Sequence, residues 1–346
     1  MKNKFIKAAW LPIDSWGFLK SKKELGSFLN KLSMAGITRL FVLVQNSRGE
    51  VIYQKTKHPI IRRFAKLDKL ETIISLAQSR SVEIRPWFMV FNQGLSRWAQ
   101  NNPEVIDKDE FNNSFEVKDF SKRIISHGSK LLCPSQEKVQ EWAFSFIEEV
   151  ANNYKVQGIH LDYIRYGEFF GWCKFCNNSH FHATGLTLEE TNKGSREWQC
   201  WIRSRVKNID RFVKTVNSFT KGKGVDLSAA VFPRYQLCIE SVGQDWVNWC
   251  QKGLLNFIVP MNYWGNFNKF NKYLSIHARA LKAGIPILEG IGNSKSCSRN
   301  SVFKPIKNPE TLLKRALEIK RRGFSGVAFF STNGLGEREL KLITDL

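Results

Sequence analysis

The chain has 346 residues, of which 42% are hydrophobic, and its 53 lysines and arginines against 31 aspartates and glutamates give a formal net charge of +22 at pH 7. This length allows either two ordinary domains or one large α/β barrel, and composition does not decide between them. The seven cysteines are an odd and mostly scattered set, which argues against a disulfide framework, and no segment reaches the roughly 18 apolar residues of a membrane-spanning helix.

The positive charge predicts attraction to polyanions such as nucleic acid, anionic lipid or acidic polysaccharide, although a generally basic surface explains it equally well. Nucleic acid is not an expected partner, because the basic residues are spread along the chain and no nucleic-acid-binding motif is evident. The first residues lack the roughly 7–15-residue apolar run of a signal peptide. Localisation therefore stays open: cytoplasmic as the sequence is written, or secreted if a leader has been removed.

In chain order, one pattern recurs: a short apolar run, a polar loop and a helix of period 3.6. Helical stripes of apolar residues run over 25–32, 139–150, 198–216 and 312–319. Eight strands are predicted, over 7–12, 39–44, 83–91, 157–162, 226–232, 257–261, 286–290 and 326–330. We therefore expect a single (β/α)8 TIM-barrel domain over 1–346, with rim insertions after strands three and four, 93–137 and 167–197. A two-domain doubly wound protein is the alternative.

The fourth predicted strand carries ionisable residues at its end, in the segment QGIHLDYIRYG of residues 157–167. Because side chains alternate along a strand, His160 and Asp162 share one face. Two polar groups pointing into a barrel form either a hydrogen-bonded structural pair or a catalytic one. Their position at the carboxyl end of a strand, where barrels keep their active sites, favours catalysis, with Asp162 transferring a proton or acting as a nucleophile.

Five segments together resemble the glycosyl-hydrolase-like family 10 barrels, relatives of a hydrolase domain that cleaves partially de-N-acetylated poly-β-1,6-N-acetylglucosamine. They are VQGIHLDYIRYG, FVLVQNSRGEVIY, NNPEVIDKD with LCPSQEKVQEW, GQDWVNWCQKGLLNFIVPMNYW and RGFSGVAFFSTNGL. The resemblance implies that Asp162 is the catalytic aspartate and that Tyr53, Asn262, Tyr263 and Trp264 lie in sugar-facing segments. The chain departs from the family pattern at Asn262, usually Gln, at Gly167, usually Pro, and at Gln157, commonly Asp.

Glycoside hydrolysis usually needs a second carboxylate. Glu289, at the end of predicted strand seven, faces strand four across a barrel mouth and is the candidate we name, although a buried glutamate paired with an arginine is an equal reading. Asp14 and, less so, Glu168 are the other candidates.

The remaining candidates would bind substrate: aromatic faces cover the apolar surface of pyranose rings, and arginines bind acidic groups or neutralise Asp162. The full set is Trp10, Asp14, Tyr53, Asn92, His160, Tyr163, Arg165, Arg234, Asn262, Tyr263 and Trp264.

The segment WCKFCNNSHFHATG offers a possible zinc-ligand set, Cys173, Cys176, His180 and His182. The spacing is much shorter than in a zinc finger, so reduced thiols are the favoured reading, and we expect no metal and no cofactor. The sequence thus predicts a glycoside hydrolase that cleaves a polysaccharide, with a catalytically inactive carbohydrate-binding barrel as the alternative. Because the positive charge would repel a cationic polyglucosamine, an acidic or neutral glycan is the expected substrate.

Overall fold

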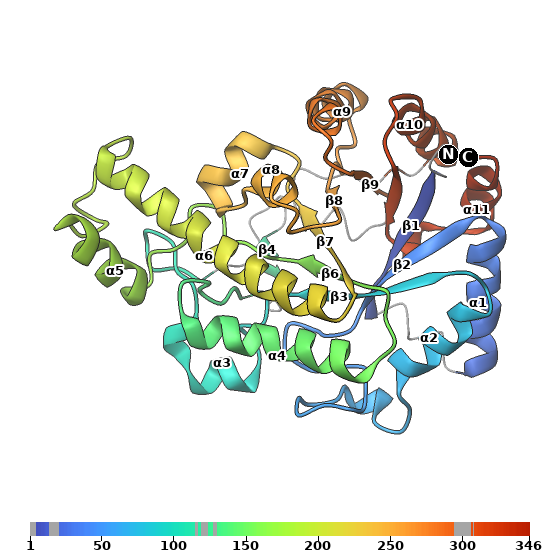
Figure 1. The fold of residues 1–346 in the computed structure, drawn as a ribbon, viewed down its shortest axis with the longest axis horizontal. Helices are drawn as coiled ribbons and strands as arrows, with labels where there is room; N and C mark the ends of the chain where they lie inside the picture. Colours follow the sequence, from blue (N-terminus) through green and yellow to red (C-terminus); the bar gives the residue numbers. More distant parts are fainter. Residues whose placement is uncertain are drawn as a thin grey trace.

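The computed structural model describes residues 5–13, 21–114, 130–293, 306 and 308–346, and the backbone of 117–118 and 124–126. Eight parallel strands form one sheet in the order β8-β7-β6-β3-β2-β1-β10-β9. Two isolated parallel bridges, Ile258 to Ile287 and Met261 to Gly290, join β8 to β9 and bring the sheet round into a nearly closed barrel. The predicted barrel fold is confirmed (Figure 1). The strands are β1 (Ile6–Leu11), β2 (Ile37–Leu43), β3 (Glu83–Met89), β6 (Gly158–Asp162), β7 (Asp226–Val231), β8 (Phe257–Pro260), β9 (Leu288–Gly292) and β10 (Gly326–Phe330).

Helices alternate with these strands. They are α1 (Lys22–Met34), α2 (Lys69–Gln78), α3 (Arg97–Asn101), α4 (Glu137–Asn153), α5 (Lys174–Thr184), α6 (Arg196–Gly222), α7 (Tyr235–Val242), α8 (Trp246–Gln251), α9 (Phe267–Lys282), α10 (Pro309–Arg321) and α11 (Glu337–Thr344). Between β3 and α4 lie α3 and the antiparallel pair β4 (Val117–Lys118) and β5 (Ile124–Ser126). Between β6 and α6 lies α5, which Figure 1 shows far from the barrel strands. None of the described helices is both long and apolar enough to cross a membrane.

The helices form where the sequence pattern places them. The apolar stripe of α4 is buried from Val139 to Val150, and the long α6 buries its stripe from Trp198 to Val216. Ser195 starts α6 by accepting a hydrogen bond from the Trp198 N–H. Strand β9 begins two residues later than the sequence predicts, because its regular pairing with β10 starts at Leu288 opposite Gly326.

The amino-terminal end of the barrel interior is filled by an ion network. Arg39 and Arg85 both bind Glu83, and Arg85 Nη2 lies 2.8 Å from Asp226 Oδ2. Both guanidinium groups also lie 4.8 Å from the centre of the Phe257 ring. This end of a barrel serves stability rather than catalysis.

Aromatic rings fill the interior above this network. Trp10 is the centre of the cluster: its ring lies 5.2 Å from Phe41, 5.5 Å from Phe330 and 5.8 Å from His160. Trp87 lies 6.1 Å from Phe330. These rings make a rigid floor beneath the carboxyl ends of the strands, where Asp162 ends β6.

Candidate active site

Asp162 is the last residue of β6 and is 7% exposed. Each carboxylate oxygen accepts one hydrogen bond: Oδ2 from Trp87 Nε1 at 3.1 Å and Oδ1 from the backbone N–H of Tyr163 at 2.7 Å. Tyr163 has a positive φ of 52°, a strained conformation for a residue with a side chain. The backbone turns at Tyr163, and the N–H group of this residue fixes the orientation of the Asp162 carboxylate.

The environment of Asp162 shifts its acidity into the physiological range. Burial raises the pKa of the carboxyl group from 3.8 to about 6, although the Tyr163 N–H, the charge of Arg165 and the Trp87 N–H act in the opposite direction. A carboxyl group with a pKa near 6 changes its protonation state close to neutral pH, as acid–base chemistry requires.

His160 lies one layer deeper, on the same face of β6. It is fully buried and stacks on Phe41 at 3.9 Å between ring centres. Its Nδ1 lies 3.1 Å from the hydroxyl of Ser228, which in turn donates to the carbonyl of Ile159. Burial keeps the pKa of His160 well below its ordinary value, so the ring is neutral. We place His160 in the floor of the site rather than among groups that reach a substrate.

Glu289 is the second residue of β9, and its side chain contacts α9. Its side chain is fully buried and lies against His277 of α9, with His277 Nδ1 2.9 Å and 3.0 Å from its two oxygens. The other ring nitrogen, Nε2, lies 2.8 Å from the carbonyl of Pro233. Because both ring nitrogens face acceptors, both donate, and His277 is a cation.

The buried ion pair, the alternative role that the sequence allows for Glu289, is therefore present, with a histidine in place of an arginine. Burial lowers the pKa of His277, but the charge of Glu289 and the hydrogen bonds outweigh burial and leave that pKa raised.

The side chains of the three residues Asn262, Tyr263 and Trp264, which follow β8, pack in different places. Asn262 is fully buried, and its Nδ2 donates to Glu289 Oε1 at 2.8 Å and to the carbonyl of Phe270 at 3.1 Å, so it belongs to the α9 side. Tyr263 stacks on Phe330 at 5.3 Å and joins the interior aromatic floor. Trp264 stacks on Tyr273 at 5.6 Å, and the Lys269 ammonium lies over its ring. Of the three, Tyr263 packs with the interior aromatic rings beneath Asp162, which is nearest to the sugar-facing position predicted for all three.

The other expected substrate-binding residues are dispersed. Arg165 is buried between the rings of Tyr163 and Phe232, at 4.9 Å and 4.7 Å, and donates to the carbonyl of Tyr166. Burial, the largest effect, lowers the pKa of its guanidinium.

Tyr53 is fully buried against Tyr154, Asn92 is buried after β3, and Trp10 lies in the floor. Arg234 is exposed at the start of α7. Asp14 lies outside the described residues.

Several partners that define the site were not selected by sequence reasoning. Trp87 is not among the predicted substrate-binding residues, but its hydrogen bond to Asp162 gives it a specific role. Trp87 of β3 pairs in register with His160 of β6, a neighbourhood that the sequence alone does not give. His277, on α9, has no counterpart in any sequence pattern.

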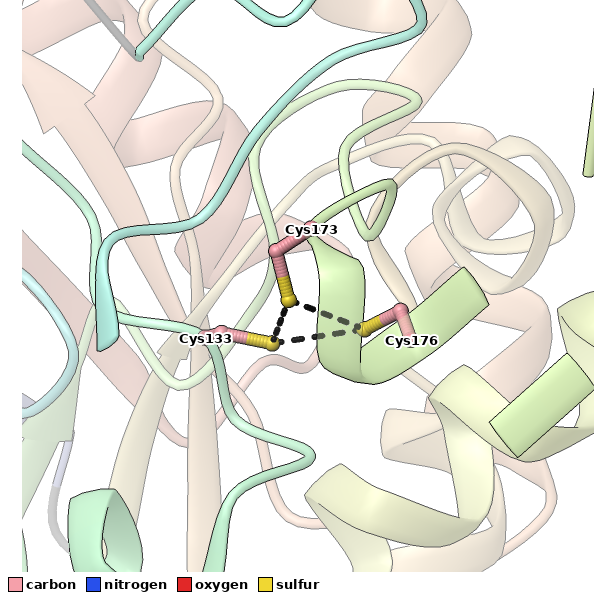
Figure 2. Close-up of side chains that lie close together, drawn as sticks. All are labelled: Cys133, Cys173 and Cys176. Carbon is pink, nitrogen blue, oxygen red and sulfur yellow. Dashed lines mark hydrogen bonds between the residues drawn. The ribbon is translucent and has the colours of Figure 1, made fainter. Parts of the chain in front are cut away.

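The possible zinc-ligand set of Cys173, Cys176, His180 and His182 is not brought together. His180 Nε2 lies 2.9 Å from the Thr191 hydroxyl, and His182 is exposed. Cys173 and Cys176 instead lie beside Cys133, which comes from the insertion after β3 (Figure 2). The sequence spacing gave no reason to add Cys133, because about forty residues separate it from the other two.

A parallel barrel with a desolvated aspartate at the carboxyl end of a central strand is an arrangement found among TIM-barrel glycoside hydrolases. The family described as Glycosyl hydrolase-like 10 matches residues 6–296, and the chain belongs to this family.

Similar solved structures agree on the fold. The PgaB (BpsB) glycoside hydrolase domain of Bordetella bronchiseptica has a TM-score of 0.75 at 11% identity, over 99% of this chain and 98% of that one. The α-L-fucosidase isoenzyme 2 of Paenibacillus thiaminolyticus has a TM-score of 0.68 at 16% identity, over 99% of this chain and 48% of that one.

A curated relative, an S-layer-related protein of Niallia circulans, is 24% identical over 249 residues. The match covers 60% of this chain but only 15% of that protein.

Proposed function

We propose that this protein is a glycoside hydrolase that cleaves O-glycosidic bonds of a polysaccharide, with Asp162 as its essential carboxylate. One observation carries the proposal: the buried acid Asp162 at the carboxyl end of a barrel strand, oriented by two N–H donors and with a pKa raised to about 6. Family membership and the fold shared with glycosidases support the same class of reaction.

The hydrogen bonds favour one form of Asp162. Both of its oxygens accept N–H groups, an arrangement suited to the ionised carboxylate. Asp162 therefore serves as the base, nucleophile or charge-stabilising group of the reaction. The half-buried rings of Tyr163 and Phe330 offer apolar surface for a sugar ring beside it.

We propose a residue other than Glu289 as the second carboxylate, because the Glu289 side chain is already bound by His277 and Asn262. Asp14 and the exposed Glu168 stay candidates for this role. The same observation favours a second candidate function: a barrel that binds carbohydrate without cleaving it, which would need no second acid.

The net charge of +22 bears on the substrate. A strongly basic protein repels a polymer that carries free amines and attracts one that carries carboxylates or sulfates. We therefore propose an acidic or neutral glycan as the substrate.

The test is a panel of acidic, neutral and cationic polysaccharides, assayed for new reducing ends and, separately, for binding. We expect cleavage of an acidic or neutral polymer, a loss of at least about 100-fold in Asp162→Asn, and retained binding by that variant. Glu141→Gln, an exposed change on α4, is the matched control and should keep full activity.

Binding without cleavage by the wild type would support the silent barrel instead. Preferential cleavage of the cationic polymer would refute the charge argument, and absence of both binding and cleavage across the panel would overturn both functions.

A further inference from the structure

The three cysteines Cys133, Cys173 and Cys176 form a compact buried cluster outside the candidate active site (Figure 2). We propose that they bind one zinc ion, which joins the two rim insertions of the barrel. The proposal does not depend on carbohydrate cleavage.

The distances between the sulfur atoms suit a shared ion. Cys133 Sγ lies 3.4 Å from both Cys173 Sγ and Cys176 Sγ, and the last two lie 3.6 Å apart. A zinc ion about 2.3 Å from each sulfur fits roughly 1 Å out of the plane of such a triangle. In a regular tetrahedral site, sulfur atoms at this bond length are ~3.8 Å apart, so only a small outward movement is needed.

The backbone fixes the three positions independently of any ion. Cys173 is the N-cap of α5 and Cys176 lies in its first turn, where the helix dipole and free N–H groups favour negatively charged thiolates. The segment that carries Cys133 is held by hydrogen bonds from Cys133 N to the Val105 carbonyl and from Leu132 N to the Phe91 carbonyl. The two parts of the chain are anchored separately. The tertiary fold, and not the spacing of residues within one segment, therefore brings the three thiols together.

The surroundings supply a polar shell. The Ser135 hydroxyl lies 2.8 Å from Cys133 Sγ and 3.0 Å from Cys176 Sγ, so it can donate to a thiolate. Asp107 is fully buried nearby, and within the described residues its Oδ2 has no hydrogen-bond partner.

Charge and space also fit a metal site. A zinc ion with three thiolates carries one net negative charge, and the buried guanidinium of Arg205 offsets it. Arg205, Ser135 and Cys176 line one cavity of about 240 Å³, which leaves room for a water molecule as the fourth ligand.

A disulfide explains the cluster less well, because it would use two of the sulfur atoms and leave the third buried without a function. Three nearly equidistant sulfurs are the arrangement expected of a thiophilic metal ion, and a site made only of thiolates favours zinc over magnesium or calcium.

The proposed ion would have a structural role. Leu188 of the insertion after β6 packs with Trp198, Trp201 and Ile202 at the start of α6 in a small core separate from the barrel core. An ion held by Cys133 on one side and by Cys173 and Cys176 on the other would tie this small core to the segment that follows β3.

The experiment measures metal in the full chain, purified without a polyhistidine tag, loaded with excess Zn²⁺ and desalted. We expect about one zinc per chain, falling below roughly 0.2 in Cys133→Ser, Cys173→Ser and Cys176→Ser. Cys250→Ser, which removes a cysteine of α8 outside the cluster, is the matched control and should keep the full amount.

Titration of the wild type with Co²⁺ supplies a readout that does not depend on how the variants fold. Thiolate-to-cobalt charge-transfer absorption with the visible bands of a tetrahedral ion is the expected spectrum. A wild-type protein that retains no zinc and gives no such spectrum would overturn the proposal. So would equal zinc loss in Cys250→Ser, or a disulfide between two of the three cysteines in protein kept under anaerobic conditions.

Discussion

Asp162, the last residue of β6, and Glu289, the second residue of β9, are two buried acids whose surroundings give them opposite properties. Asp162 accepts two neutral N–H donors and has no salt bridge among the described residues, so its ionised form is disfavoured by burial. Glu289 is paired with a buried histidine cation. The first arrangement leaves a carboxyl group that titrates without a salt bridge in the described part of the chain, and the second is a buried ion pair with His277.

The raised pKa of Asp162 predicts a stability cost at neutral pH. An acid whose folded-state pKa lies above its unfolded value loses native stability as the pH rises from that lower value through the higher one. From the shift of 3.8 to about 6, the wild type should lose up to about 3 kcal/mol relative to Asp162→Asn between about pH 4 and 7.5. Urea unfolding of both proteins at the two pH values measures this. A difference that does not change with pH would contradict it.

Replacing Glu289 should lower the free energy of unfolding, whereas Asp162→Asn should raise it relative to the wild type at neutral pH. Glu289→Gln leaves the buried His277 cation without its partner, which we expect to cost about 3–5 kcal/mol in unfolding free energy. The raised pKa of His277 also means that the pair's contribution is present at low pH and is lost as the pH rises through that pKa. Urea unfolding across pH should show this loss in the wild type but not in the variant. A cost below about 1 kcal/mol would return Glu289 to the list of possible catalytic acids.

At the scale of strands and helices, periodicity predicted most of the fold. The eight strands and the long stripes of α4 and α6 follow directly from the alternation of apolar runs with helical patterns. The direction of side chains on β9 did not follow, because the segment reads PILEGIG and is apolar on both sides of Glu289. Only the packing of α9 against that strand reveals which face Glu289 occupies.

Contacts between distant insertions were also beyond sequence reasoning. Cys133 meets Cys173 and Cys176 only because the loops after β3 and β6 fold over adjacent strands. Spacing rules address ligands within one segment, and they led to His180 and His182 instead.

The junction of β8 and β9 depends on Gly290. An added Cβ at this residue would lie 2.7 Å from the carbonyl oxygen of Pro260, a backbone atom that cannot move without opening the barrel. Gly290→Ala should therefore lower the unfolding free energy by about 1–3 kcal/mol. Gly222, at the end of α6, has open space around it, so Gly222→Ala is the control.

Thermal and urea unfolding should show Gly222→Ala as neutral or slightly stabilised, since alanine favours helix. Equal stability of the two variants would mean that the two strands separate at no cost.

For the whole molecule, the net charge of +22 predicts electrostatic attraction to an acidic polymer and repulsion of a cationic one. Added salt shortens the range of this attraction, from ~30 Å at 0.01 M to ~3 Å at 1 M. Affinity for an acidic polysaccharide should fall at least about tenfold between about 50 and 300 mM NaCl, while affinity for a neutral one changes less than about twofold. Fluorescence titration with size-matched polymers measures both. If affinity for the neutral polymer fell as much with salt, attraction between the basic protein and an acidic polymer would not explain the salt dependence.

Strand β1 pairs with β10 as well as with β2, with Ile6 opposite Gly326. During synthesis, the free side of β1 therefore stays unpaired until the roughly three hundred residues that separate it from β10 have left the ribosome. A nascent chain stalled short of β10 would expose that unpaired edge to other chains, which makes slow or interrupted translation a route to aggregation.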